Sequence, residues 1–211
     1  MLFRSGVVDK ASYRTLVADL WHVYSAMEEE IGRLADHPVV GPINFAALNR
    51  RETLEQDLAY YFGSDWRHQI RATPGAQDYV ARIRRVAQEA PELLVGHHYT
   101  RYIGDLSGGQ ILKNIAQKAM NLGDHDGLRF YEFDSIPDEK GFKTNYRAVL
   151  DSLPIDQSTA DRIVAEANQA FHCNMKMFQE LEGNLVAAIG KVLFGFLTKR
   201  QRAGSTEVVP A

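Results

Sequence analysis

RYIGDLSGG, residues 101–109, places three glycines inside a stretch that otherwise favours a helix. Each glycine in a helix interior costs about 1 kcal/mol relative to alanine, so the three together cost about 3 kcal/mol. Gly104 and Gly108 are four residues apart and lie on one helix face, which therefore carries no side chains. Another group can come close to the backbone there, and the helix can bend.

Two interpretations of this bare face follow from the spacing. In the first, a second helix packs closely on Gly104 and Gly108, although such pairs are mostly a device of membrane helices. In the second, a flat ligand lies on the bare face, with Asp105 beside it and Arg101 one turn before. Aspartate is a poor residue for a helix interior. Its simplest structural role is an ion pair with Arg101 worth a few tenths of a kcal/mol.

The string LSGGQ within this stretch, Leu106–Gln110, is also the signature of ABC-type ATPases. Those proteins need a phosphate-binding loop of the form GxxxxGK[ST] after a strand. Here Gly190-Lys191 is followed by Val192, and no glycine stands five residues before Gly190. The sequence therefore excludes this class of ATPase.

Apolar side chains recur at three- and four-residue steps along most of the chain, which is typical of helices. No stretch alternates as a strand does, and there are no repeats or low-complexity linkers. We expect an all-α, single-domain fold with helices around one core. The predicted helices cover about 9–37, 50–62, a region around 79–86, 91–120, 142–153 and 156–178, and a loop is expected over 121–140.

Charge and cysteine content narrow the class of protein. The net charge of −3 does not suggest nucleic-acid binding. A single cysteine, Cys173, permits no intramolecular disulfide, which fits a cytoplasmic protein. The most apolar run, Leu185–Leu197, is too short to span a bilayer and contains Lys191, so no membrane anchor is expected. Residues 201–211 are predicted to form a disordered tail.

Several longer stretches resemble one known family. PELLVGHHYTRYIGDLSGGQILKNIAQKAM, Pro91–Met120, resembles the distal helix of the biliverdin-forming heme oxygenases. The match is collinear from about Gly6 to Thr198 and is closest to the cyanobacterial and plastid type. Further matching stretches are YSAMEEE (24–30), LEQDLAYYFG (54–63), FKTNYR (142–147) and AFHCNMKMFQELE (170–182). The resemblance implies a heme oxygenase domain over residues 1–200, with heme between a proximal helix and a kinked, glycine-rich distal helix.

This resemblance implies a reaction as well as a fold. Heme, as both cofactor and substrate, would be cleaved with O2 to biliverdin, CO and ferrous iron. The chain has no flavin or dinucleotide motif, so electrons must come from outside, and the cyanobacterial type implies reduced ferredoxin as the donor. The oligomeric state stays open.

The resemblance also implies roles for individual residues. Gly104 and Gly108 would let the backbone lie against the porphyrin, and Asp105 would anchor a water network that delivers a proton during oxygen activation. The residues that extend or border this network are Arg101, Tyr24 and Asn174. The residues at the heme edge or pocket wall are Tyr99, Lys143, Arg147, Phe171 and Phe178. Lys143 and Arg147 are four apart on one helix face, a spacing suited to two propionates.

Spacing alone leaves structural explanations open for these residues. Tyr24 continues the apolar stripe of the first helix, and Phe171 and Phe178 would be core residues in any helical bundle. Lys143 and Arg147 could form a solvated face. Only the joint match to the family favours heme.

The sequence departs from the family at its beginning. The family's iron-ligating histidine lies shortly before the position matched by Gly6, so it is expected upstream of Met1, and none of the seven histidines replaces it easily. We therefore expect an N-terminally truncated chain that binds heme weakly. The alternatives to an enzyme are an inactive heme-binding protein and a helical interaction module without a cofactor.

Overall fold

The computed structural model describes residues 10–181, and within them the fold is helical without a strand. The α-helices are α1 (Lys10–Arg33), α2 (Arg51–Phe62), α3 (Trp66–Gln69), α4 (Pro74–Glu89), α5 (Leu94–His98), α6 (Gly104–Met120), α7 (Glu139–Asp151) and α8 (Gln157–Gln179). Short 3-10 turns are η1 (Gly41–Ile43), η2 (Ala46–Leu48), η3 (Pro91–Leu93) and η5 (Arg129–Tyr131), and η4 (Tyr99–Ile103) is π-helical. The all-α prediction is confirmed. The expected tail (201–211) and the apolar run Leu185–Leu197 lie outside the described residues.

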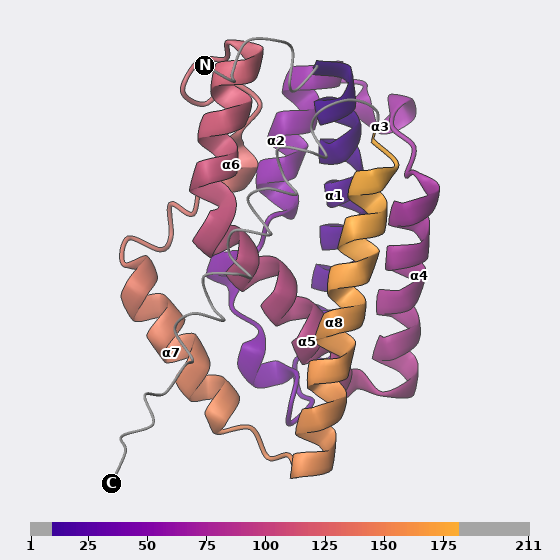
Figure 1. The fold of residues 1–211 in the computed structure, drawn as a ribbon, viewed down its shortest axis with the longest axis vertical. Coiled ribbons are helices and arrows are strands. Elements are labelled where there is room, and N and C mark those ends of the chain that lie inside the picture. Colours follow the sequence, from indigo (N-terminus) through magenta and orange to yellow (C-terminus); the bar gives the residue numbers. More distant parts are fainter. Residues whose placement is uncertain (1–9, 182–211) are drawn as a thin grey trace, which may run out of the picture.

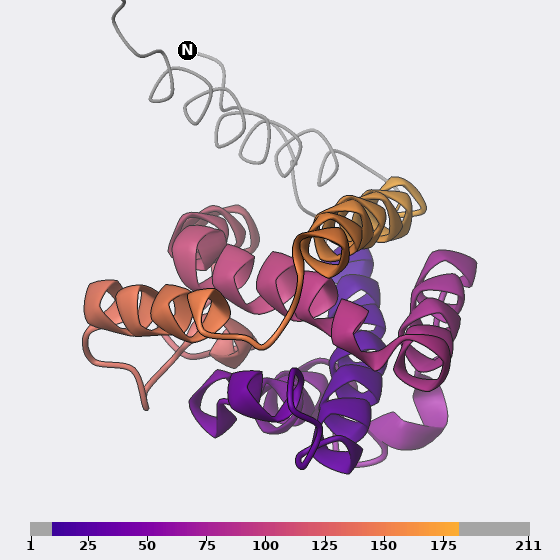
Figure 2. The same cartoon turned by 90° about the horizontal axis from the view of Figure 1, so that it is seen from below.

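Helix α1 occupies the middle of the molecule. It packs against α2 and α4, while α8 packs against α4 and α5 (Figure 1). Helix α7 stands at the edge, away from α4 (Figure 2). The stripe predicted on α1 is buried throughout, with each side chain at most 3% exposed: Tyr13, Leu16, Val17, Leu20, Tyr24, Met27 and Ile31. None of the described helices is both long and apolar enough to cross a membrane.

A buried carboxyl group joins α1 to the start of α4. Asp19 is 0% exposed and accepts hydrogen bonds from the Thr73 backbone N (2.8 Å) and hydroxyl (2.7 Å). Burial raises the pKa of Asp19 to about 6, although both hydrogen bonds oppose that shift. Thr73 in turn caps α4 by accepting from Ala76 N. This contact fixes where α4 begins.

The single helix expected over 91–120 is interrupted. Its first turn is the 3-10 helix η3, and the π-helical η4 separates α5 from α6. A π turn accommodates one extra residue and bends the helix, and it lies directly before Gly104. A π turn thus lies at the start of the glycine-rich part of the helix that was expected to be kinked.

Close packing fixes the N-terminal side of the kink. A Cβ atom added to Gly96 would lie 2.7 Å from the Ile163 carbonyl oxygen of α8, so only glycine permits this approach. Thr100 Oγ1 donates to the Gly96 carbonyl at 2.8 Å and lies 3.3 Å from the Ala167 carbonyl. Helices α5 and α8 are thus held together backbone to backbone.

A buried ion pair reinforces the same region. Glu166 of α8 is 4% exposed, and its Oε1 lies 2.8 Å from both Arg82 Nε and His97 Nε2. Burial opposes ionisation of this carboxyl, but the hydrogen bonds from Arg82 and His97 outweigh it and lower the pKa of Glu166 to about 2. Glu166 therefore ties α4, α5 and α8 together through one ionised group.

The lowered pKa gives Glu166 a defined pH dependence. A carboxyl group with a lowered folded-state pKa stabilises the fold above its unfolded value, and this contribution is lost as the pH falls towards 2. We expect Glu166→Gln to lower the free energy of unfolding by about 2 kcal/mol at pH 7. Below about pH 4.5, the free energy of unfolding of this variant should decrease less steeply with falling pH than that of the wild type. Urea unfolding followed by circular dichroism at several pH values measures both effects.

Asp78→Asn is the matched control, because Asp78 pairs with Lys176 at 2.5 Å on the surface, where both side chains are more than half exposed. Exposed pairs contribute little, so this variant should unfold like the wild type. Equal stabilities for Glu166→Gln and the wild type at pH 7 would contradict the role given to the buried pair.

Candidate functional site

Four residues predicted as catalytic meet where α1, η4, α6 and α8 converge. The Tyr24 hydroxyl donates to Asp105 Oδ2, and Arg101 Nη2 lies 3.4 Å from the same oxygen. Arg101 Nε lies 3.2 Å from the Tyr24 hydroxyl oxygen, and Arg101 Nη1 donates to Asn174 Oδ1 at 2.5 Å. We call Tyr24, Arg101, Asp105 and Asn174 the Asp105 cluster.

The cluster is largely shielded from solvent. Tyr24 is 0% exposed and Arg101 is 4% exposed, while the Asp105 side chain keeps 14% of its surface accessible. Burial raises the pKa of Asp105 well above its ordinary value and lowers the pKa of Arg101. A carboxyl group in this state can hold a proton at a pH at which an exposed aspartate is ionised. Its remaining exposed surface lets that proton leave.

The structural and functional explanations of Tyr24 both apply. Its ring packs edge-on against Tyr102 and Phe130, with centroids 5.1 and 5.5 Å apart, as a core residue does. Its hydroxyl belongs to the Asp105 cluster. The i,i+4 pair between Arg101 and Asp105 is also present. It forms part of a larger network rather than an isolated surface pair.

The three glycines of the motif have different surroundings. A Cβ atom added to Gly104 would meet no heavy atom of the described residues within 4 Å. One added to Gly109 would lie 3.1 Å from Tyr131 Cδ1, so this glycine serves close packing. Gly108 is buried. With respect to the described residues, the predicted bare face is thus open at Gly104, next to Asp105, whereas Gly108 on the same face is buried.

The residues predicted at the heme edge lie on α7, α8 and η4. Tyr99 and Phe171 are half-buried, and Phe178 is buried in the core. Lys143 forms a 3.5 Å ion pair with Glu139, whereas Arg147 is exposed and has no ion pair with a described residue. Within residues 10–181 no hydrogen bond or ion pair joins these side chains to the Asp105 cluster. They belong to a second group of residues.

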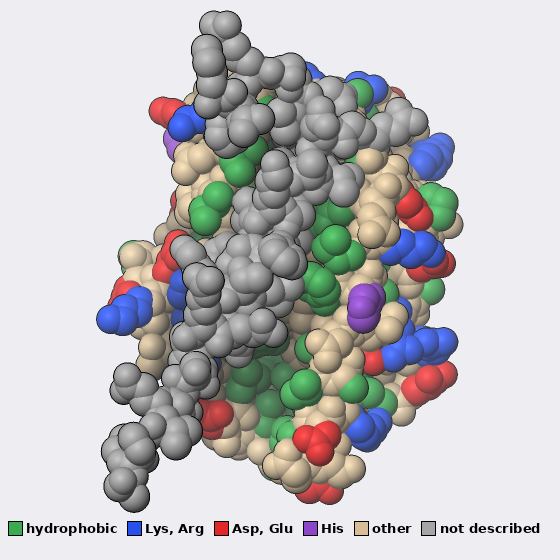
Figure 3. Space-filling view, in the orientation of Figure 1, with side chains coloured by type: hydrophobic (Ala, Val, Ile, Leu, Met, Phe, Trp, Pro, Cys, Tyr) green, Lys and Arg blue, Asp and Glu red, His purple; other side chains and the backbone are tan. Residues whose placement is uncertain are grey.

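The visible surface of the molecule differs in character between its two sides. Hydrophobic side chains gather between α7 and α8, whereas many Lys, Arg, Asp and Glu side chains lie over α4 (Figure 3). A large apolar ligand would find apolar surface on the side of α8 that faces α7.

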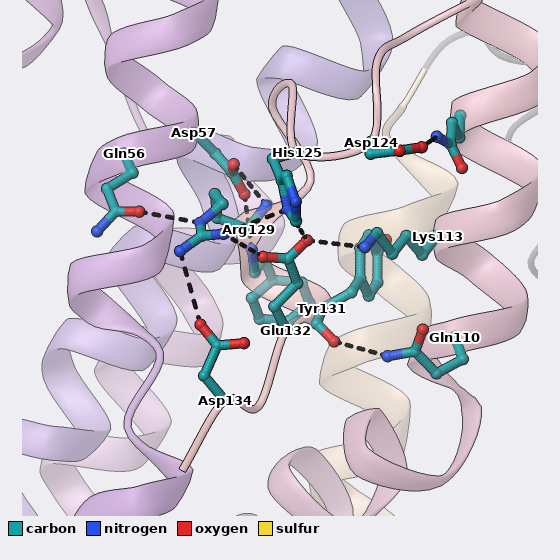
Figure 4. A network of polar contacts seen from close by, with 12 residues as sticks. Gln56, Asp57, Gln110, Lys113, Asp124, His125, Arg129, Tyr131, Glu132 and Asp134 are labelled. Atoms are coloured by element: carbon teal, nitrogen blue, oxygen red, sulfur yellow. Dashed lines mark hydrogen bonds and ion pairs between the residues drawn. The ribbon is translucent and has the colours of Figure 1, made fainter. Parts of the chain in front are cut away.

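A polar network outside the predicted site holds α6 in place (Figure 4). Glu132 is 9% exposed, and its carboxylate accepts from Lys113 of α6 at 2.7 Å and from Arg129 at 2.5 Å. Asp57 of α2 accepts from the backbone N atoms of Arg129 and Phe130 at 2.8 and 2.9 Å. The segment 121–138, expected only as a loop, thus connects α2 to the distal helix. Sequence reasoning missed this role because its partners are far apart in the chain.

No hydrogen bond or ion pair joins a described histidine to the Asp105 cluster. His97 and His98 are buried and contact Glu166 and Tyr146. His22 lines a groove between α1 and α4 together with Trp21 and Arg84, and Tyr24 of the Asp105 cluster does not line it. Among the described residues, no three His, Cys, Asp or Glu side chains gather as a metal site requires.

These residues fit one kind of ligand. Gly104 offers a bare backbone surface, Asp105 a carboxyl group beside it, and α7 two cations one turn apart. A flat, largely apolar molecule with two carboxylates matches this set, and heme is such a molecule. The described residues could therefore supply the distal side of a heme site and two cations for the carboxylates of the heme.

Comparison with known proteins points to the same ligand. The family model described as heme oxygenase matches residues 2–180. Heme oxygenase 1 of Nostoc sp. is 60% identical over 209 residues, which cover 99% of this chain and 88% of that protein. Heme oxygenase of the alga Porphyra purpurea is 51% identical over 93% of this chain and 84% of its own length.

Solved structures agree with the sequence relatives. Heme oxygenase-1 of Synechocystis sp. in complex with heme superimposes with a TM-score of 0.82 at 60% identity, covering 91% of this chain and 86% of that one. Heme oxygenase-2 of the same organism, in complex with heme and NO, gives a TM-score of 0.83 at 45% identity, covering 98% and 86%. The chain therefore belongs to the heme oxygenase family, whose members cleave heme to biliverdin.

Proposed function

We propose that this chain cleaves heme to biliverdin, CO and ferrous iron, and that the Asp105 cluster is its proton-handling centre. The observation that carries the proposal is the position of Asp105. It lies beside the bare backbone of Gly104 and is held by Tyr24 and Arg101. A protein that only stored heme would have no use for a buried carboxyl group with a raised pKa at this place.

Heme, when bound, supplies both the iron that activates O2 and the porphyrin that is oxidised. Asp105 holds a proton on its carboxyl group and passes it to water on the open side of the helix. The Tyr24 hydroxyl and the Arg101 guanidinium orient the Asp105 Oδ2 atom, and Asn174 fixes Arg101 from α8. These contacts keep the proton at one defined atom.

The remaining residues of the site bind and enclose the substrate. Gly104 and Gly108 let the porphyrin approach the backbone. Lys143 and Arg147 bind the two propionates as a pair of cations on one face of α7. Tyr99, Phe171 and Phe178 line the apolar part of the pocket and exclude water.

We infer further that reduced ferredoxin supplies the electrons and that O2 is the oxidant, as the sequence suggests. The single cysteine is consistent with a cytoplasmic protein. We take residues 1–200 as the heme oxygenase domain and residues 201–211 as a tail.

Replacing the Asp105 carboxyl tests the centre of the proposal. We expect Asp105→Asn to reduce biliverdin formation at least about 100-fold, because general acid–base groups contribute on that scale. Heme affinity should stay within about threefold, since the amide has the same size. The measurement is biliverdin absorbance and CO release with heme and a ferredoxin reducing system in air.

The control is Asp124→Asn, in the exposed loop that follows α6, where Asp124 accepts from Gln117 at 3.1 Å. This variant should turn over like the wild type. A wild-type rate of biliverdin formation in Asp105→Asn would show that Asp105 takes no part in the reaction.

Filling the bare face at Gly104 should have opposite effects on stability and on heme binding. Gly104 has helical torsion angles (φ −61°, ψ −49°), and no described residue would contact an added methyl, so Gly104→Ala should stabilise the ligand-free chain by up to about 1 kcal/mol. The added methyl should weaken heme binding about tenfold, because it occupies a tight contact. Urea unfolding and heme titration by absorbance measure the two effects.

Gly96→Ala provides the contrast on the same helix, since its methyl would lie 2.7 Å from a backbone oxygen of α8. It should destabilise the fold. Unchanged heme affinity in Gly104→Ala would show that heme does not lie on this face.

A further inference from the structure

Helix α7 buries one side chain fully and packs others, such as Phe142 and Leu150, only partly against the core. Tyr146 is the only buried residue of α7 and is 1% exposed. Its ring packs against Phe45 and Tyr99 at centroid distances of 5.5 and 6.3 Å, and Phe142 packs edge-on against Phe45 at 5.4 Å. Figure 2 shows α7 at the margin of the helical array. The placement of α7 therefore depends in part on the contacts of Tyr146.

His98 of α5 provides the hydrogen-bond partner of the Tyr146 hydroxyl. The Tyr146 hydroxyl and His98 Nδ1 are 2.7 Å apart, and the two rings are stacked within 6°. Burial lowers the pKa of His98 to about 3 and raises the pKa of Tyr146, so both groups are neutral at physiological pH. A neutral hydrogen bond in a dry environment is directional, and removing one partner leaves the other unsatisfied.

His98 also contacts the residues around the Asp105 cluster. Its ring lies 4.4 Å from that of Tyr102, whose hydroxyl donates to Glu28 Oε1 at 3.3 Å. The Tyr102 ring packs against Tyr24, which donates to Asp105. His98 thus stands between the cluster on the distal helix and the helix that carries the two cations.

The same helix α7 carries Lys143 one turn before Tyr146, and Arg147 directly after it. A helix is stiff, so the contacts of its one fully buried side chain, Tyr146, help to set where both cations lie. We propose that His98 is a positioning residue, whose contact with Tyr146 holds Lys143 and Arg147 at the place where they bind the heme propionates. This inference rests on the proposed function.

The adjacent histidine distinguishes this role from general packing. His97 is equally buried and also bonds through a ring nitrogen, but its partner is Glu166 of α8. Replacing His97 should disturb α8 and leave α7 in place. The chain therefore contains its own matched control.

The first experiment needs no heme. Hydrogen exchange of the ligand-free full chain is followed by mass spectrometry in the wild type, His98→Leu, His98→Asn and His97→Leu. In His98→Leu we expect exchange of residues 139–151 to accelerate roughly tenfold, as loss of one buried hydrogen bond predicts. His98→Asn, which retains a polar atom near the position of Nδ1, should restore protection, and His97→Leu should leave α7 unchanged.

Unaltered α7 exchange in His98→Leu would overturn the inference, as would an equal effect of His97→Leu. If His98→Leu does not fold, Tyr146→Phe replaces it. That change removes only the hydroxyl and carries the same expectations.

The second experiment separates this inference from the proposed function. Hemin and its dimethyl ester, which lacks the two carboxylates, are titrated into each variant. The wild type should prefer hemin. In His98→Leu the ratio of the affinities for hemin and the ester should fall roughly tenfold, while the affinity for the ester stays the same. In His98→Asn this ratio should return towards the wild-type value.

Equal wild-type affinity for hemin and the ester would overturn the role of Lys143 and Arg147 in the proposed function, and this inference with it. A wild-type preference for hemin that persists undiminished in His98→Leu would overturn the positioning role alone.

Discussion

A buried guanidinium is the constraint on which the rest of the structure depends. Arg101 is 4% exposed, and a buried cation is costly unless hydrogen bonds compensate it. Its partners come from α1, α6 and α8, so the three helices must converge for the charge to be accommodated. The site is therefore assembled by the same contacts that satisfy Arg101. Loss of one partner would affect both folding and chemistry.

Most of the helices could be predicted from the sequence because their signals are local. Apolar periodicity located α1, α2, α4 and α8, and Asp156 caps α8 by accepting from Thr159 N. The π-helical η4 could not be predicted in this way. A shift of hydrogen bonding within a helix depends on partners such as the Ala167 carbonyl, which lies on another helix. The short helix α3 was also missed, since one turn carries too little periodicity.

The candidate site was predicted only in part, and the reason is the same. Family resemblance identified Tyr24, Arg101, Asp105 and Asn174, and the structure brings them together. His97 and His98 had no role in that resemblance. Neighbouring residues on a helix point about 100° apart, so these two reach Glu166 on α8 and Tyr146 on α7. Partners this distant in sequence leave no pattern in a single chain.

The π turn of η4 rotates the side chains that follow it about the axis of the distal helix. One added residue turns everything that follows by about 100° relative to a regular helix. The face with Gly96 and His97 packs on other helices, and the face with Gly104 and Asp105 belongs to the proposed site. The one added residue therefore determines the angle between these two faces. A loop of the same length could absorb an insertion or a deletion, but this segment cannot. The number of residues in the segment 99–103 thus determines the direction in which the carboxyl group of Asp105 points.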